Sequence, residues 1–162
     1  MANILIIYYS LEGNTKFAAE ELEILAAADT ERLQVAKEPP KSGLLKFIKG
    51  GKSALKKELP QLADLEHKLD DYEKLVLMFP IWAGTYPPAI GSFIDRYHPG
   101  WKELYLVACS KGSSPQKAFD EVAAALPECR LMGTLHLIQP SENQKEASAK
   151  LKEFSVKIIE EQ

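Results

Sequence analysis

Short apolar runs alternate along the chain with longer segments of mixed polarity. Residues 4–9, 75–79 and 104–109 are nearly continuous apolar runs, which is typical of strands buried on both faces of a sheet. Residues 131–138 read as a last strand, and the weaker alternating run 32–36 predicts the second strand in chain order. The sequence therefore predicts five strands.

Between these runs, apolar residues recur at the spacing of amphipathic helices. Residues 89–97 add a further helix, because Pro87 and Pro88 suit a helix start, where a missing N–H costs little. Three apolar stripes carry the other helices: Ala18, Leu22, Leu25 and Ala26; Phe119, Val122, Ala123 and Leu126; Ala147, Leu151, Phe154 and Ile158.

Strand–helix alternation of this kind predicts an α/β fold, a doubly wound five-stranded parallel sheet with helices on both faces. The 162 residues suit a single domain over residues 1–162 with a core of its own. Ligands of such sheets bind beyond the carboxyl ends of the strands, where the strand order reverses. The loops that follow the strands are therefore the places to look for chemistry.

Composition narrows the function classes. The net charge of −3 gives no reason to expect a nucleic-acid partner, and the longest apolar runs are too short to span a membrane. The N-terminal residues lack the basic start and cleavage site of a signal peptide, so we expect a cytoplasmic protein. Cys109 and Cys129 have no metal-ligand spacing, which predicts reduced thiols and no metal site.

Residues 37–60 hold two consecutive prolines, two consecutive glycines and seven lysines. The favoured interpretation is a solvated amphipathic helix, because charges at helical spacing usually face water. The alternative is a basic docking surface for an acidic partner.

The loop after the first strand has the composition of an anion site. Backbone N–H groups at a helix N-terminus point outward, and the helix dipole favours an anion there. Gly13 allows a sharp turn, Asn14 can cap the helix, and Ser10 and Thr15 can donate hydroxyl hydrogen bonds. A plain capped turn is the alternative. The candidate phosphate residues are Ser10, Leu11, Glu12, Gly13, Asn14 and Thr15.

Two further loops complete the candidate site. Trp82 and Tyr86 offer flat aromatic surface, and Ala83 and Gly84 let the backbone approach a ring edge. The alternative is that both aromatic residues only pack the end of the sheet. The candidate residues are Pro80, Ile81, Trp82, Ala83, Gly84, Thr85 and Tyr86 in one loop and Ser110, Lys111 and Gly112 in the other.

The pattern of Ser10, Glu12, Gly13, Asn14 and Thr15 after a leading apolar strand resembles the FMN phosphate loop of flavodoxins. The resemblance implies a sheet of order 2-1-3-4-5 and an FMN cofactor. It also implies that the Pro-x-Trp-x-Gly loop holds the flavin ring, and that residues 110–112 lie at its pyrimidine end. The chain departs from the family in that last loop, which lacks the usual Gly-Asp pair and stacking tyrosine.

The leading functional hypothesis is a flavodoxin-type electron carrier, which passes one or two electrons between redox partner proteins. The alternatives are an NAD(P)H-dependent reductase of quinones or flavin, for which the open loop at 110–112 would suit a small quinone-like substrate, and a non-redox binding module. No histidine or carboxylate is assigned a catalytic role. The sequence leaves open whether the protein is a monomer or a homodimer.

Overall fold

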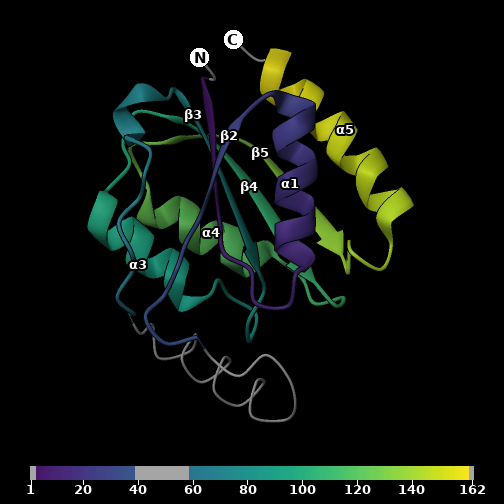
Figure 1. The fold of residues 1–162 in the computed structure, drawn as a ribbon, viewed down its shortest axis with the longest axis horizontal. Helices are drawn as coiled ribbons and strands as arrows, with labels where there is room; N and C mark the ends of the chain where they lie inside the picture. The colour runs from purple at the N-terminus through teal and green to yellow at the C-terminus, as the bar shows by residue number, and fades with distance from the viewer. Residues whose placement is uncertain (1–2, 39–58, 161–162) are drawn as a thin grey trace.

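The computed structural model describes residues 3–38 and 59–160. Its five strands form one parallel sheet in the order β2-β1-β3-β4-β5, which confirms the predicted fold class (Figure 1). The strands are β1 (Ile4–Tyr8), β2 (Asp29–Arg32), β3 (Lys74–Pro80), β4 (Glu103–Ser110) and β5 (Arg130–Ile138).

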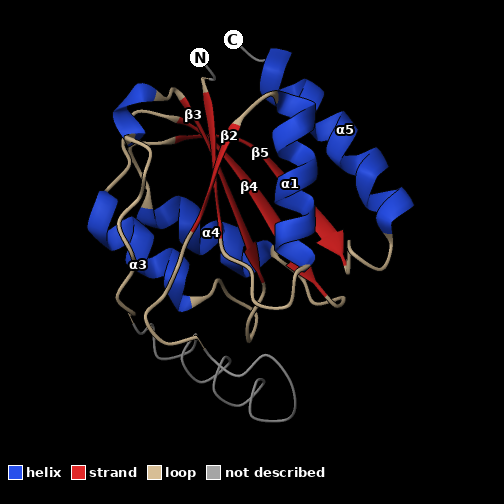
Figure 2. Ribbon diagram, in the orientation of Figure 1, coloured by secondary structure: helices blue, strands red, loops and turns tan. Residues whose placement is uncertain are grey.

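The helices lie in two layers, one on each face of the sheet (Figure 2). They are α1 (Asn14–Ala26), α3 (Pro88–Tyr97), α4 (Gln116–Ala125) and α5 (Gln144–Glu160), with a short 3₁₀ helix at Leu69–Asp71. α1 and α5 pack on one face of the sheet, whereas α3 and α4 pack on the other. These four helices of the described residues correspond to the four apolar segments predicted above.

The two faces of the sheet hold separate halves of the core. Successive side chains of a strand point to opposite faces, so Leu5 and Ile7 belong to one cluster, while Ile6 and Tyr8 belong to the other. Burying a side chain of this size contributes about 1.5–3 kcal/mol. Both faces are covered, which is why the strand sequences are continuously apolar rather than alternating.

The second strand was predicted at the wrong residues. It spans Asp29–Arg32, which pair with residues 5–8 of β1, and not residues 32–36. The alternating pattern after Arg32 has another cause. Leu33 is buried in the core, and Val35 makes an isolated antiparallel bridge with Leu62. β2 is an edge strand with half-exposed side chains, so its polar sequence carried little strand signal.

Two other expectations concern the lysine-rich segment and membrane-spanning helices. The lysine-rich segment 37–60 lies almost entirely outside the described residues, so its role stays a prediction. In the parts of the chain that the structure describes, no helix combines the length and the apolar character needed to cross a bilayer.

Candidate functional site

The loops after β1, β3 and β4 enclose a cavity of about 410 Å³ at the carboxyl ends of the strands. The first loop contributes Ser10, Leu11, Glu12, Asn14 and Thr15; the second contributes Pro80, Ile81, Trp82 and Ala83; the third contributes Ser110 and Lys111. The parallel sheet thus brings together three segments that are far apart in sequence. Cys109 and Ser113 also line the cavity and were not predicted as site residues.

The remaining predicted residues do not line the cavity but shape the loops around it. Gly13, Gly84 and Gly112 adopt positive φ values of 107°, 78° and 133°, a region that favours glycine. Thr85 is buried behind its loop, where its hydroxyl donates a 2.7 Å hydrogen bond to the Glu121 carboxylate. Tyr86 is half-buried and packs against the apolar core.

The first turn of α1 presents unpaired donors. Its first helical hydrogen bond runs from the Phe17 N–H to the Gly13 carbonyl at 3.0 Å. The N–H groups of residues 14–16 therefore have no partner within the helix. Gly13 is the N-cap residue and makes no side-chain cap, so the expectation that Asn14 could cap this helix is wrong. Ser10 Oγ instead accepts the Gly13 N–H at 3.2 Å, which closes the loop on itself.

Thr15 carries a buried hydroxyl with no nitrogen or oxygen partner among the described residues. Its side chain lines the cavity, the residue is 1% exposed, and Oγ1 has no hydrogen bond among the described residues. The Cys109 thiol on β4 is a weakly polar neighbour: burial raises the pKa of this thiol to about 12, and the Thr15 hydroxyl opposes that shift. A thiol is a weak hydrogen-bonding group, so Thr15 retains the capacity to donate to a stronger acceptor in the cavity.

The loop after β3 is a tight turn. The Trp82 N–H donates to the Thr85 carbonyl at 2.9 Å, and the Thr85 N–H donates to the Trp82 carbonyl at 3.0 Å. Both central residues have positive φ, 49° at Ala83 and 78° at Gly84, as in a type I′ turn. The Trp82 ring meets the Tyr9 ring edge to face, with centroids 5.6 Å apart. The turn and this contact together fix the aromatic wall of the cavity.

Ser110 organises the loop after β4. Its Oγ accepts the Gly112 N–H at 3.1 Å, donates to the Ser113 carbonyl at 3.0 Å, and lies 2.7 Å from His136 Nε2. A hydroxyl has one hydrogen and two lone pairs, so these three partners are all satisfied when His136 Nε2 carries a hydrogen and donates it. The sequence assigned no histidine a catalytic role, and this contact of His136 was not predicted.

The flavodoxin family matches residues 3–154. This chain belongs to the flavodoxin family. The sequence matches none of the curated proteins with which it was compared.

Solved structures share the flavodoxin fold at low sequence identity. A candidate flavoprotein from Bacteroides uniformis superposes with a TM-score of 0.77 at 21% identity, covering 94% of this chain and 97% of that one. A flavoprotein from Lactobacillus acidophilus in complex with FMN gives 0.73 at 17%, covering 90% and 98%. An NADPH-quinone reductase from P. pentosaceus gives 0.57 at 10%, covering 96% and 98%. Flavodoxin-like flavoproteins bind flavin, so the cavity can be tested against that ligand.

The residues present fit the phosphate of a flavin nucleotide. An anion at this end of α1 would meet the N–H groups of residues 14–16, which have no partner within the helix. It would also meet the buried hydroxyl of Thr15, which has no nitrogen or oxygen partner among the described residues. A ring beyond it would meet Trp82, Ile81 and Pro80, which suit an apolar planar group. In the described ranges, no group of three or more histidine, cysteine or acidic side chains could hold a metal ion.

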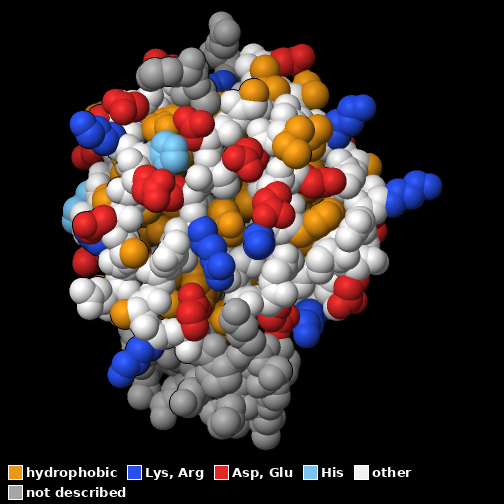
Figure 3. All heavy atoms as spheres, viewed as in Figure 1, with side chains coloured by type: hydrophobic (Ala, Val, Ile, Leu, Met, Phe, Trp, Pro, Cys, Tyr) orange, Lys and Arg blue, Asp and Glu red, His pale blue; other side chains and the backbone are white. Residues whose placement is uncertain are grey.

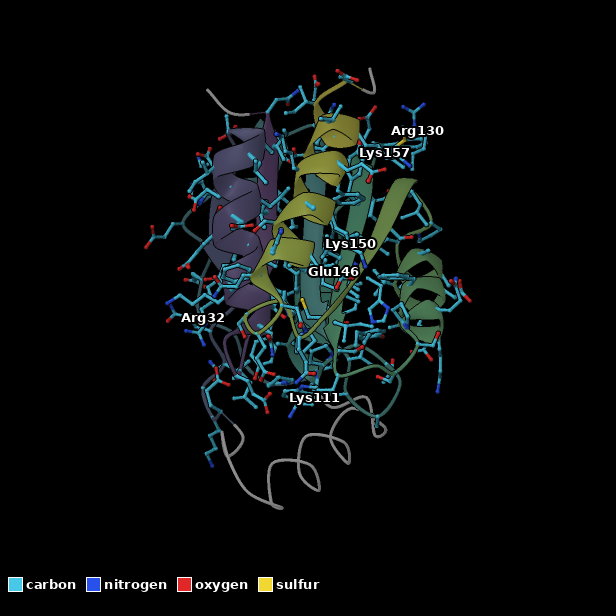
Figure 4. The ribbon with its side chains drawn as sticks, turned by 90° about the vertical axis from the view of Figure 1, so that its right-hand side faces the viewer. Arg32, Lys111, Arg130, Glu146, Lys150 and Lys157 are labelled. Carbon is cyan, nitrogen blue, oxygen red and sulfur yellow. The ribbon has the colours of Figure 1, made fainter. Side chains whose placement is uncertain are left out.

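Two charged residues, Glu12 and Lys111, line the cavity. Lys111 Nζ lies 3.9 Å from Glu12 Oε2, which links the loops after β4 and β1, and both side chains are partly exposed. Arg32, at the end of β2, donates a 2.8 Å hydrogen bond to the Ser10 carbonyl. Figure 4 shows Arg32 and Lys111 toward the same end of the sheet. On the face seen in Figure 3, acidic and basic side chains are interspersed.

Proposed function

We propose that this chain binds FMN in the cavity, with the phosphate on residues 10–15 and the flavin ring against Trp82. The observation that supports this most directly is Thr15: the residue is 1% exposed and lines the cavity, and its hydroxyl has no nitrogen or oxygen partner in the described parts of the chain. A buried, unpaired hydroxyl costs about 1–3 kcal/mol. A phosphate oxygen would relieve that cost and would also accept the N–H groups of the first turn of α1.

Each loop has a defined task in this proposal. The loop after β1 binds the phosphate through neutral donors, with Gly13 allowing the backbone to turn toward it. Trp82 covers one face of the ring, held by Tyr9. The loop after β4, held in shape by Ser110, offers its backbone to the ring edge. When bound, FMN supplies the one- and two-electron chemistry, and the protein supplies binding and orientation.

We further propose that the bound flavin carries electrons between redox partner proteins. An NAD(P)H-dependent reductase of quinones or flavin is the second candidate, and one observation favours it. Lys111, Gly112 and Ser113 are exposed, and none of them is aromatic, so no ring from this loop covers the cavity. That open side would let a small substrate stack on the flavin.

The purified protein tests the first proposal. Added FMN should bind to the apo-protein with quenched flavin fluorescence, and a protein that binds no FMN would refute it. Thr15→Val, which removes the hydroxyl, should bind FMN more weakly. Thr15→Ser, which keeps the hydroxyl, is its matched control. NADPH under nitrogen then separates the two roles: a carrier stays yellow until a reductase protein is added, whereas a reductase is bleached by NADPH alone.

A further inference from the structure

The loop that follows β5 contributes no lining residue to the cavity, yet it is bonded to the first residue of α1. Asn14 Oδ1 accepts two hydrogen bonds from Ser141, one from the backbone N–H at 3.1 Å and one from the hydroxyl at 2.6 Å. The two residues lie 127 positions apart in sequence. Asn14 lines the cavity, so this contact reaches the candidate phosphate site from behind.

The contact fixes which end of the Asn14 amide faces the cavity. A backbone N–H can only donate, so the Asn14 atom that it meets must be the amide oxygen and not the nitrogen. The Ser141 hydroxyl occupies a second acceptor position on the same oxygen. Asn14 Nδ2 has no acceptor among the described residues, so its two hydrogens remain available to a ligand.

We propose that Ser141 is a positioning residue that orients the Asn14 amide so that Nδ2 donates to the phosphate of a bound flavin nucleotide. The inference rests on the proposed FMN binding and adds a residue outside the cavity to it. Asn14 Oδ1 would repel a phosphate oxygen if the amide turned over. Two hydrogen bonds to Oδ1 make that rotamer costly, so the binding geometry is set before the ligand arrives.

A second serine in the same layer supplies a matched control. Ser148 on α5 donates from its hydroxyl to the Glu21 carboxylate on α1, at 2.9 and 2.7 Å. This contact also joins the C-terminal part of the chain to α1 across 127 positions, but neither residue lines the cavity. Ser148→Ala therefore removes a similar contact without touching the Asn14 amide.

The test compares FMN with riboflavin, which has the same ring and no phosphate. Ser141→Ala should weaken FMN binding about 3- to 10-fold, the effect of losing one neutral hydrogen bond, because the Ser141 backbone N–H still holds Oδ1. Riboflavin affinity should change less than twofold. Ser141→Thr, which keeps a hydroxyl, should restore FMN binding, and Ser148→Ala should leave it unchanged. Equal losses for both ligands, or no loss of FMN affinity, would overturn the proposal.

A double-mutant cycle isolates the pathway through Asn14. In an Asn14→Ala background, Ser141→Ala should cause no further loss of FMN affinity, because the group that it positions is gone. Independent, additive losses would contradict positioning. If the wild-type protein binds no flavin, the proposed function is wrong, and inorganic phosphate becomes the probe: the Asn14 side-chain amide signals should shift on titration in the wild type and less in Ser141→Ala. Identical shifts in both proteins would refute the orientation.

Discussion

Replacing Thr15 by Val removes the unpaired hydroxyl and keeps the branched shape of the side chain. Thr15 is the second residue of α1 and is 1% exposed. Val and Thr have similar helix propensities, so the change acts mainly through the hydroxyl. Thr15→Val should stabilise the apo-protein, where the hydroxyl is buried without a ligand. It should weaken FMN binding, because the hydroxyl would donate to the phosphate in the complex.

The magnitudes follow from what the hydroxyl contacts. In the apo-protein Oγ1 has no partner in the described structure, and a group left in that state costs about 1–3 kcal/mol. The Cys109 thiol offsets part of this, so we expect Thr15→Val to raise apo-protein stability by about 1 kcal/mol, a Tm increase of about 2–4 °C. In the complex the hydroxyl would donate to a charged phosphate, a bond of about 1.5–3 kcal/mol, so FMN should bind about 10- to 100-fold more weakly.

Calorimetry of the apo-protein and a fluorescence titration with FMN measure the two effects. Thr15→Ser keeps the hydroxyl and should lose far less FMN affinity, and riboflavin should bind Thr15→Val almost as well as it binds the wild type. An apo-protein that is destabilised by Thr15→Val, together with unchanged FMN affinity, would show that the hydroxyl serves the fold and not a phosphate.

Three further predictions concern other parts of the molecule. Ala27 ends α1 at a φ of 49°, so Ala27→Gly should raise the free energy of unfolding by about 0.5–1 kcal/mol, as thermal melting would show; an unchanged or lower Tm would contradict this. Burial and the charge of Lys150 lower the pKa of His136, so its contribution to stability is present above pH 6.5 and is lost as pH falls through the lowered pKa. Denaturant titrations should show a smaller acid loss in His136→Gln, and an unaltered pH profile would refute the assignment. The pKa of about 12 leaves roughly one Cys109 thiol in 10⁴ ionised at pH 8. Iodoacetamide should therefore modify half-buried Cys129 first, and mass spectrometry showing Cys109 modified first in the folded protein would contradict the burial of Cys109.

The sequence was sufficient for four of the five strands and for the place of the cavity. Continuous apolar runs identify strands buried on both faces, and parallel strands carry their carboxyl ends to one edge, so the loops after β1, β3 and β4 had to meet. β2 was predicted at the wrong residues because it lies at the edge of the sheet, where side chains are only partly buried and the sequence shows only a weak apolar pattern. Its polar residues, Asp29–Arg32, resemble a turn more than a strand.

The residues that brace the cavity were beyond sequence reasoning, for a physical reason. Arg32 bonds to Ser10 across 22 positions, His136 to Ser110 across 26, and Ser141 to Asn14 across 127. Such contacts depend on strand order and register, which no local pattern records. His136 is an example: only the pairing of β5 with β4 places it opposite Ala108, two positions before Ser110.

These bracing contacts explain how a cavity with no lysine among residues 10–15 could hold an anion. An ammonium group attracts a phosphate from many directions, whereas N–H and O–H donors act only within a narrow range of angles. A site built from neutral donors must therefore hold each one in place before the ligand binds. Ser10 holds the Gly13 N–H, and Ser141 holds the Asn14 amide. The need to orient each neutral donor, and not the cavity's lining alone, explains why elements as distant as β2 and the loop after β5 contact residues 10–14.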